Sequence, residues 1–181
     1  MRPNLTSSRK LAGALIVAIA IVAVISAVRG LPGGPPLVDD DAALMSPDER
    51  AFVASFHGFL IKDHNIDYRV VTVDGAGDID RFAAKRFEKL FANSRSATGR
   101  GLLLVIDPEQ DQVRLEVSLA LEGVFPDAFI AYVEHRQMAP FFRKGRIADG
   151  ILASTELIAR RAQRAATNAG FDANDFPSPA Q

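Results

Sequence analysis

The chain contains no cysteine. This absence excludes disulfide bonds, thiolate zinc sites, iron–sulfur clusters and every mechanism that uses a cysteine nucleophile. It does not indicate a compartment, because cysteine-free chains occur on both sides of membranes. Any chemistry in this protein must therefore come from other side chains.

Several local catalytic signatures are missing as well. The glycines in 75–77 lack the third glycine of a dinucleotide-binding loop, and no GK[ST] phosphate-binding loop follows them. There is no G-x-S-x-G nucleophile elbow, and His57, His64 and His135 do not form an HExxH zinc motif. The cysteine-x5-arginine, D-x-D-x-T and R-H-G signatures of phosphatases are also absent.

Basic residues are scarce over most of the chain. Of the 21 lysines and arginines, four lie in residues 1–30, which contain no acid, so residues 31–181 have 17 basic and 22 acidic side chains and a net charge of −5. General nucleic-acid binding needs a basic surface that neutralises phosphates. The composition therefore argues against a nucleic-acid partner.

One long apolar run is present near the amino terminus. Residues 11–28 carry no charge and only one polar side chain, Ser26. A helix of this length would extend about 27 Å, close to the hydrocarbon thickness of a bilayer. The run is longer than the apolar part of most cleaved signals, although Ser26-Ala27 offers a weak cleavage site. An uncleaved anchor and a cleaved signal both remain open.

The charges around this run predict its orientation. Arg9 and Lys10 precede it and only Arg29 follows it, which favours a cytoplasmic amino terminus. Either alternative predicts that residues 31–181 lie outside the cytoplasm, in the periplasm of a bacterium. An uncleaved anchor would contact the lipid bilayer through residues 11–28.

With 181 residues, the chain has room for one domain of average size besides this segment. We expect a membrane anchor or signal over 1–29, a glycine- and proline-rich linker over 30–37, a folded domain over 38–168 and a polar tail over 169–181.

Four helices and three strands are predicted within the domain. Ser46-Pro47-Asp48-Glu49 forms a helix start with a capping box, and Phe52, Phe56, Phe59 and Leu60 recur on one face of the helix that follows. The predicted helices cover 47–62, 78–92, 127–138 and 147–168, with a basic turn over 141–146.

The predicted strands cover 66–73, 101–106 and 112–119. The middle strand is continuously apolar, as expected of a strand that is buried on both faces. The last alternates, with Val113, Leu115, Val117 and Leu119 on one face. A crossover helix predicts a parallel first pair, and the short turn over 107–111 predicts an antiparallel hairpin. The fold class is therefore α/β, a small mixed sheet sandwiched by helices and preceded by one transmembrane helix.

An acidic constellation is the remaining candidate site. Asp40 or Asp41 enters the domain, and Glu122 and Asp127 flank the break after the alternating strand. Arg114 and Arg143 are candidate anion-binding partners. Calcium and other hard divalent cations take several oxygen ligands, which can come from distant segments. The alternative interpretation is structural, with Glu122 as a turn residue and Asp127 as a helix cap.

Four segments together resemble the TPM-domain family. They are LVDDDAALMS over 37–46, GRGLLLVI over 99–106, VSLALEGVFPDA over 117–128 and MAPFFRKGRIADGI over 138–151. The resemblance covers about 37–155 in the family's order, and LEG-x-x-PD followed by P-x-F-R-x-G is fairly specific. The resemblance implies an α/β sandwich held outside the cytoplasm by a hydrophobic segment.

The resemblance also bears on function. Members are associated with photosystem repair in the thylakoid lumen and with modulation of receptors at animal cell surfaces, and acid phosphatase activity and calcium binding have been attributed to some plant members. It implies that Asp40 matches the opening acid of the family, Glu122 its LEG step and Asp127 its PD step. Ser118 and Ala120 depart from the family pattern, which has glycines there, so a site built by that loop is altered.

Three functions follow as hypotheses. The first is a membrane-tethered binding or accessory domain whose partners are membrane proteins. The alternative is a divalent-metal-assisted acid phosphatase that uses the acidic constellation. The third is a purely structural protein of the cell envelope.

Overall fold

The computed structural model describes residues 36–167. The expected anchor or signal, nearly all of the linker and the expected tail lie outside the described residues. Between residues 36 and 167, no helix combines the length and the apolar character that crossing a bilayer requires.

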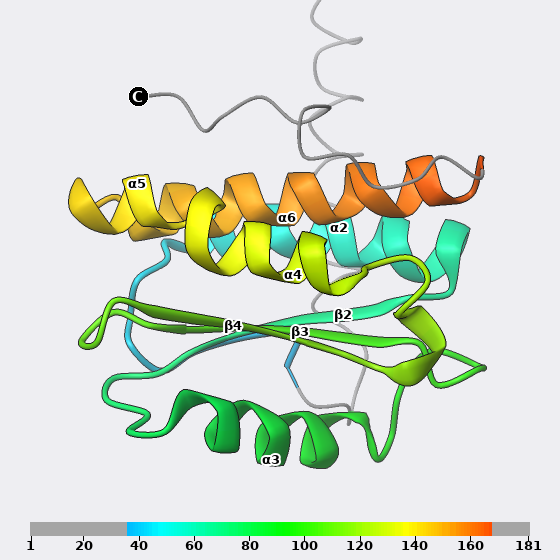
Figure 1. Ribbon diagram of the computed structural model, residues 1–181, viewed down its shortest axis with the longest axis horizontal. Coiled ribbons are helices and arrows are strands. Elements are labelled where there is room, and N and C mark those ends of the chain that lie inside the picture. Colours follow the sequence, from blue (N-terminus) through cyan, green and yellow to red (C-terminus); the bar gives the residue numbers. More distant parts are fainter. Residues whose placement is uncertain (1–35, 168–181) are drawn as a thin grey trace, which may run out of the picture. The chain divides into compact units, whose positions relative to one another are not determined.

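A mixed sheet forms the centre of the domain. Its strands β1 (Val38–Asp40), β2 (Asp67–Thr72), β3 (Gly101–Asp107) and β4 (Gln112–Val117) lie in the order β1-β2-β3-β4 (Figure 1). The first three strands are parallel, and β4 is antiparallel to β3. The predicted parallel pair, the hairpin and the mixed sheet are confirmed.

Helices cover both faces of this sheet. Helix α3 (Ile79–Phe91) lies alone on one face (Figure 1). The opposite face carries α2 (Pro47–His64), α4 (Asp127–Tyr132), α5 (Ala139–Arg143) and α6 (Ile147–Ala165). Helices α2 and α6 run side by side in the same direction over the sheet.

Burial follows from this layering. All seven residues of β3 are buried, as its continuous apolar run predicted. Leu102, Leu104 and Ile106 belong to the larger core under α2, α4 and α6. Leu103 and Val105 belong to the smaller core under α3. The side chains alternate between the two cores because successive residues of a strand point to opposite faces.

The start of α2 is formed as predicted. The Ser46 hydroxyl accepts a hydrogen bond from the Glu49 amide at 3.3 Å, and the Glu49 carboxylate accepts one from the Ser46 amide at 2.7 Å. This reciprocal pair satisfies two amides that would otherwise lack partners at the helix terminus, and Pro47 occupies the first turn without losing a hydrogen bond.

Two local expectations were wrong. Leu119 is not part of the buried face of β4, because the strand ends at Val117 and Leu119 begins a short 3-10 turn in which its side chain is 82% exposed. Ser118 accepts a hydrogen bond from the Gly101 amide at 3.0 Å, which holds this turn against the start of β3. The expected basic turn over 141–146 begins as helix α5 and turns only after Arg143.

Two further elements were not expected. The predicted helix over 127–138 is divided into α4 and a π-helical turn, Val133–Gln137. The strand β1 was missed because Val38-Asp39-Asp40 lacks the apolar or alternating pattern of a strand. It forms at the edge of the sheet, where Asp39 pairs with Arg86 of α3.

Candidate functional site

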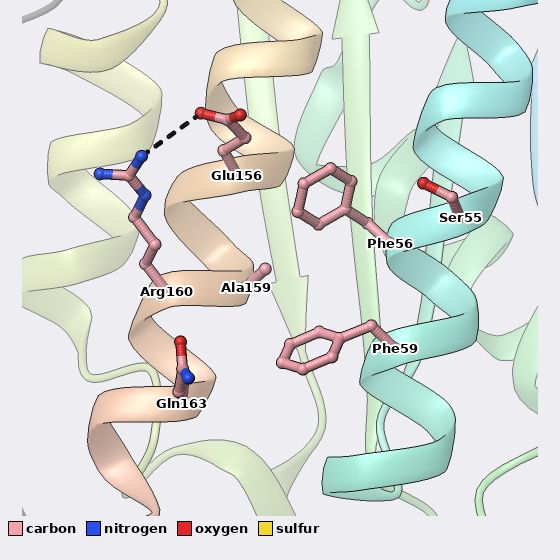
Figure 2. Close-up of a pocket in the computed structure, with 7 residues that line it drawn as sticks. All are labelled: Ser55, Phe56, Phe59, Glu156, Ala159, Arg160 and Gln163. Carbon is pink, nitrogen blue, oxygen red and sulfur yellow. Dashed lines mark ion pairs between the residues drawn. The ribbon is translucent and has the colours of Figure 1, made fainter.

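A groove lies between α2 and α6. It has a volume of about 400 Å³ and is lined by Ser55, Phe56 and Phe59 from α2 and by Glu156, Ala159, Arg160 and Gln163 from α6 (Figure 2). The two phenylalanine rings point from α2 toward α6, and the Ala159 methyl group faces them. The groove therefore has an apolar floor.

The sequence of α2 explains why aromatic side chains reach this groove. The buried residues of α2 are Val53, His57 and Leu60. Phe52, Phe56 and Phe59 each precede one of them, which rotates them by about 100° around the helix axis. They therefore lie on the flank of α2 and not on the face that meets the sheet.

The exposure of these aromatic side chains confirms the flank position. Phe52 is 39% exposed, and Phe56 and Phe59 are only partly buried. The ring centroids of Phe52 and Phe56 are 5.0 Å apart, so the aromatic surface continues beyond the groove. The sequence analysis placed Phe52, Phe56, Phe59 and Leu60 on one face of the helix, and of these four only Leu60 is fully buried. The sequence does contain a signal for this exposed aromatic surface. Helix α2 carries two adjacent apolar stripes, although one stripe is sufficient to pack against the sheet.

Helix α6 supplies the other wall. Ala159 leaves room above the phenylalanine rings that a larger side chain would fill. Glu156 and Arg160 form an ion pair of 3.7 Å one turn apart, with side chains that are 46% and 64% exposed. An exposed pair of this kind contributes little to stability, so both side chains remain available to a ligand at the rim.

One residue of β2 connects both walls of the groove. The Tyr68 carbonyl accepts a hydrogen bond from His57 Nδ1 of α2 at 2.8 Å. The Tyr68 hydroxyl lies 2.9 Å from Thr155 Oγ1 of α6, which itself donates to the Ile151 carbonyl at 2.8 Å. Because Thr155 has one proton, Tyr68 is the donor to Thr155. Tyr68 thereby fixes the positions of α2 and α6 relative to each other.

A buried ionic cluster lies next to His57. Arg69 donates two hydrogen bonds to Asp67, at 3.1 and 2.8 Å, and both side chains are buried. Burial alone would raise the pKa of Asp67, but the bonds from Arg69 and the Arg95 amide hold it below its usual value. Burial lowers the pKa of His57, against the opposing effect of the Tyr68 carbonyl. The cluster joins α2, β2 and the loop after α3.

Asp40 has a structural environment. Its carboxylate is 4% exposed and accepts four hydrogen bonds. The donors are the amides of Leu44 and Met45 at 3.0 and 2.9 Å, Thr72 Oγ1 at 2.7 Å and Arg50 Nη1 at 3.1 Å. Burial alone would raise the pKa of Asp40, but these hydrogen bonds hold it below its usual value.

The sheet separates Asp40 from Glu122 and Asp127. Asp40 is in register with Thr72 of β2, which is in register with Ile106 at the end of β3. Glu122 follows β4, whose last residue, Val117, is in register with Leu102 at the start of β3. Asp40 and Val117 are therefore about 13 Å apart along the strands and about 14 Å apart across them. Glu122 and Asp127 are exposed, at the end of the 3-10 turn and in the first turn of α4.

These three acids are therefore not brought together. Within residues 36–167, no group of three or more histidine, cysteine or carboxylate side chains is placed to hold a metal ion.

The two arginines expected to bind anions also lie apart. Arg114 is in β4 and is surrounded by carboxylates, at 2.9 Å from Glu116, 3.4 Å from Asp80 and 3.5 Å from Glu134. Burial opposes the charge of Arg114, but these partners hold its pKa above the usual value. Arg143 is exposed at the end of α5.

Comparisons with known proteins agree with this fold. A family profile described as the TPM domain matches residues 38–161. A solution NMR structure of the N-terminal domain of a protein from P. gingivalis is similar to this chain, with 26% identity and a TM-score of 0.64. The match covers 76% of this chain and 87% of that one. No curated protein matches the chain.

Proposed function

This chain belongs to the TPM-domain family, and from that premise we propose that it is a membrane-tethered, extracytoplasmic binding domain whose groove between α2 and α6 docks a helix of a membrane protein. The tether in this proposal is the apolar run over residues 11–28. The partner presents an apolar helical face to the phenylalanines of α2.

The observation that carries the proposal is the aromatic groove itself. Phenylalanine side chains at Phe52, Phe56 and Phe59 leave apolar surface in contact with water, which is unfavourable unless a partner covers it. Two parallel helices flank the groove and Tyr68 holds them in place, so the surface is formed before a partner binds. A groove of this kind suits an amphipathic helix that inserts side chains at helical spacing.

A photo-reactive amino acid at Ser55 tests this docking site. Ser55 is exposed and lines the groove, so a crosslinker there should react with an integral membrane protein in intact membranes that contain the full chain. The same crosslinker at Lys85, exposed on α3 across the sheet, is the matched control. Replacement of Phe56 by serine should remove the crosslink from Ser55. Equal products from both positions, or products unaffected by Phe56→Ser, would contradict the proposed site.

The metal-assisted phosphatase has weaker support. Both oxygens of Asp40 already accept hydrogen bonds from the protein, and Glu122 and Asp127 lie at the other end of the sheet. A direct assay is phosphomonoester hydrolysis by the full chain with and without calcium, beside a Glu122→Gln, Asp127→Asn variant. Both positions are exposed, so the variant should fold. Calcium-dependent turnover that this variant loses would favour the phosphatase over the binding domain.

A further inference from the structure

The described part of the chain ends close to the groove. Helix α6 ends at Ala165, two residues beyond Gln163, which lines the groove. The remaining residues, 168–181, read NAGFDANDFPSPAQ. They contain Phe171 and Phe176, two aspartates and no basic residue.

We propose that the segment 168–181 is an intramolecular ligand of the groove, in which Phe171 and Phe176 cover the exposed phenylalanines of α2. The segment competes with the membrane-protein helix for the same surface. The regulatory meaning of this competition rests on the proposed function, whereas the docking itself does not.

The length of the segment is sufficient. From Ala165 back to Ala159 is six helical residues, or about 9 Å along α6. Four extended residues from Thr167 to Phe171 span up to about 13 Å, and nine residues to Phe176 span up to about 30 Å. Phe52 and Phe59 are about 10 Å apart along α2. Both phenylalanines of the segment can therefore reach the aromatic surface, and Gly170 suits the reversal of direction that this needs.

One basic side chain at the rim of the groove is complementary in charge to the segment. Arg160 at the rim of the groove is 64% exposed, and its ion pair with Glu156 is long at 3.7 Å. Asp172 and Asp175 lie between Phe171 and Phe176 in the sequence. An aspartate can therefore approach Arg160 while the two rings occupy the apolar floor. The segment has no positive side chain, so it does not compete with Arg160 for Glu156.

Tethering makes weak contacts effective. A short flexible connection gives an effective concentration of about 1 mM, so a segment with an intrinsic Kd of about 0.1 mM would fill about 90% of the grooves. An external partner would then bind about tenfold more weakly than to a chain without the segment. The segment would thus set a threshold for docking.

Tryptophan fluorescence provides the test, because the chain contains no tryptophan. Phe59→Trp places a single reporter in the groove, and Ser55→Trp, at an exposed position on the same wall, is a second reporter should the first disturb folding. The full chain is held in lipid nanodiscs, and acrylamide quenching is compared between the intact tail and Phe171→Ser, Phe176→Ser. The matched control, Ser178→Ala with Gln181→Ala, changes the tail outside its aromatic part.

The proposal predicts that the double serine variant raises the quencher-accessible fraction about tenfold, that the control does not, and that a synthetic peptide of residues 168–181 restores protection. Equal quenching in all three chains would overturn it. Protection that depends on protein concentration would also overturn it, in favour of a second copy as the occupant. Loss of membrane-protein crosslinking with tail docking intact would instead count against the proposed function alone.

Discussion

Asp40 Oδ1 accepts a hydrogen bond of 2.7 Å from Thr72 Oγ1, across the parallel pairing of β1 with β2. The two residues occupy the same rung of the sheet at the point where β1 ends and the chain turns toward α2. The remaining donors to Asp40 come from that turn and from Arg50 in α2. Asp40 therefore joins the edge strand, its neighbour and the first helix.

Replacement of Asp40 by asparagine should destabilise the fold. The amide would present N–H groups to donors that now meet carboxylate oxygens, and a loss of about 2 kcal/mol in the free energy of unfolding follows. Urea denaturation measures it. Asp41→Asn, at the exposed neighbouring position, removes the same charge and should leave the stability within about 0.5 kcal/mol. An Asp40→Asn chain that is fully stable but loses calcium binding would restore Asp40 as a metal ligand.

His57 should make the stability fall as the pH is lowered below neutral. Burial holds the pKa of His57 below its usual 6.5 in the folded chain. Below that pH the unfolded chain takes up a proton that the folded chain resists, so stability decreases by up to about 1.4 kcal/mol per pH unit. The stability is retained at higher pH, where the His57 imidazole is neutral in both the folded and the unfolded chain.

An asparagine at position 57 tests this effect. His57→Asn keeps a donor near the Tyr68 carbonyl but does not titrate, so the slope of melting temperature against pH between 7.5 and about 5.5 should flatten. His135→Asn removes an exposed imidazole and serves as the control. An unchanged slope in His57→Asn would show that another group causes any acid sensitivity.

Two helical glycines should respond in opposite directions to alanine. A Cβ atom at Gly150 would lie 2.9 Å from Phe141 Cβ and 3.0 Å from Met138 Sδ, so Gly150→Ala forces α5 away from α6. We expect a loss of about 1–3 kcal/mol. A Cβ atom at Gly58 in α2 meets nothing within 4 Å, so Gly58→Ala should gain about 0.5–1 kcal/mol through helix propensity. Thermal unfolding of the pair checks both signs, and equal shifts would contradict the close packing of α5 on α6.

The absence of cysteine permits a direct test of membrane topology. A single cysteine introduced at Lys85, exposed on α3, should react with a membrane-impermeant maleimide added outside the cytoplasmic membrane. One introduced at Thr6, before the apolar run, should react only after the cells are lysed. Labelling of both or of neither in intact cells would contradict the expected orientation. Retention of the Thr6 reporter in the same polypeptide as the domain would favour an anchor over a cleaved signal.

Much of the fold was predictable because its signals are local. The Ser46–Glu49 capping box fixes the start of α2 through atoms only three residues apart. The apolar run of β3 requires burial on both faces, whatever the identity of the elements that cover it. The short turn between β3 and β4 allows only an antiparallel pair. These features, together with the motifs of the TPM domain, were determined by the sequence itself.

The candidate site depended on tertiary structure. The residues Val38-Asp39-Asp40 become a strand only because β2 offers an open edge, and Asp40 accepts hydrogen bonds from a turn and from a strand 32 residues away. Periodicity placed Phe52 on an apolar face of α2 but did not indicate which of two adjacent stripes meets the sheet. Packing against α6 decided this, because burial depends on which neighbouring elements are present, and that information is distributed over the whole chain.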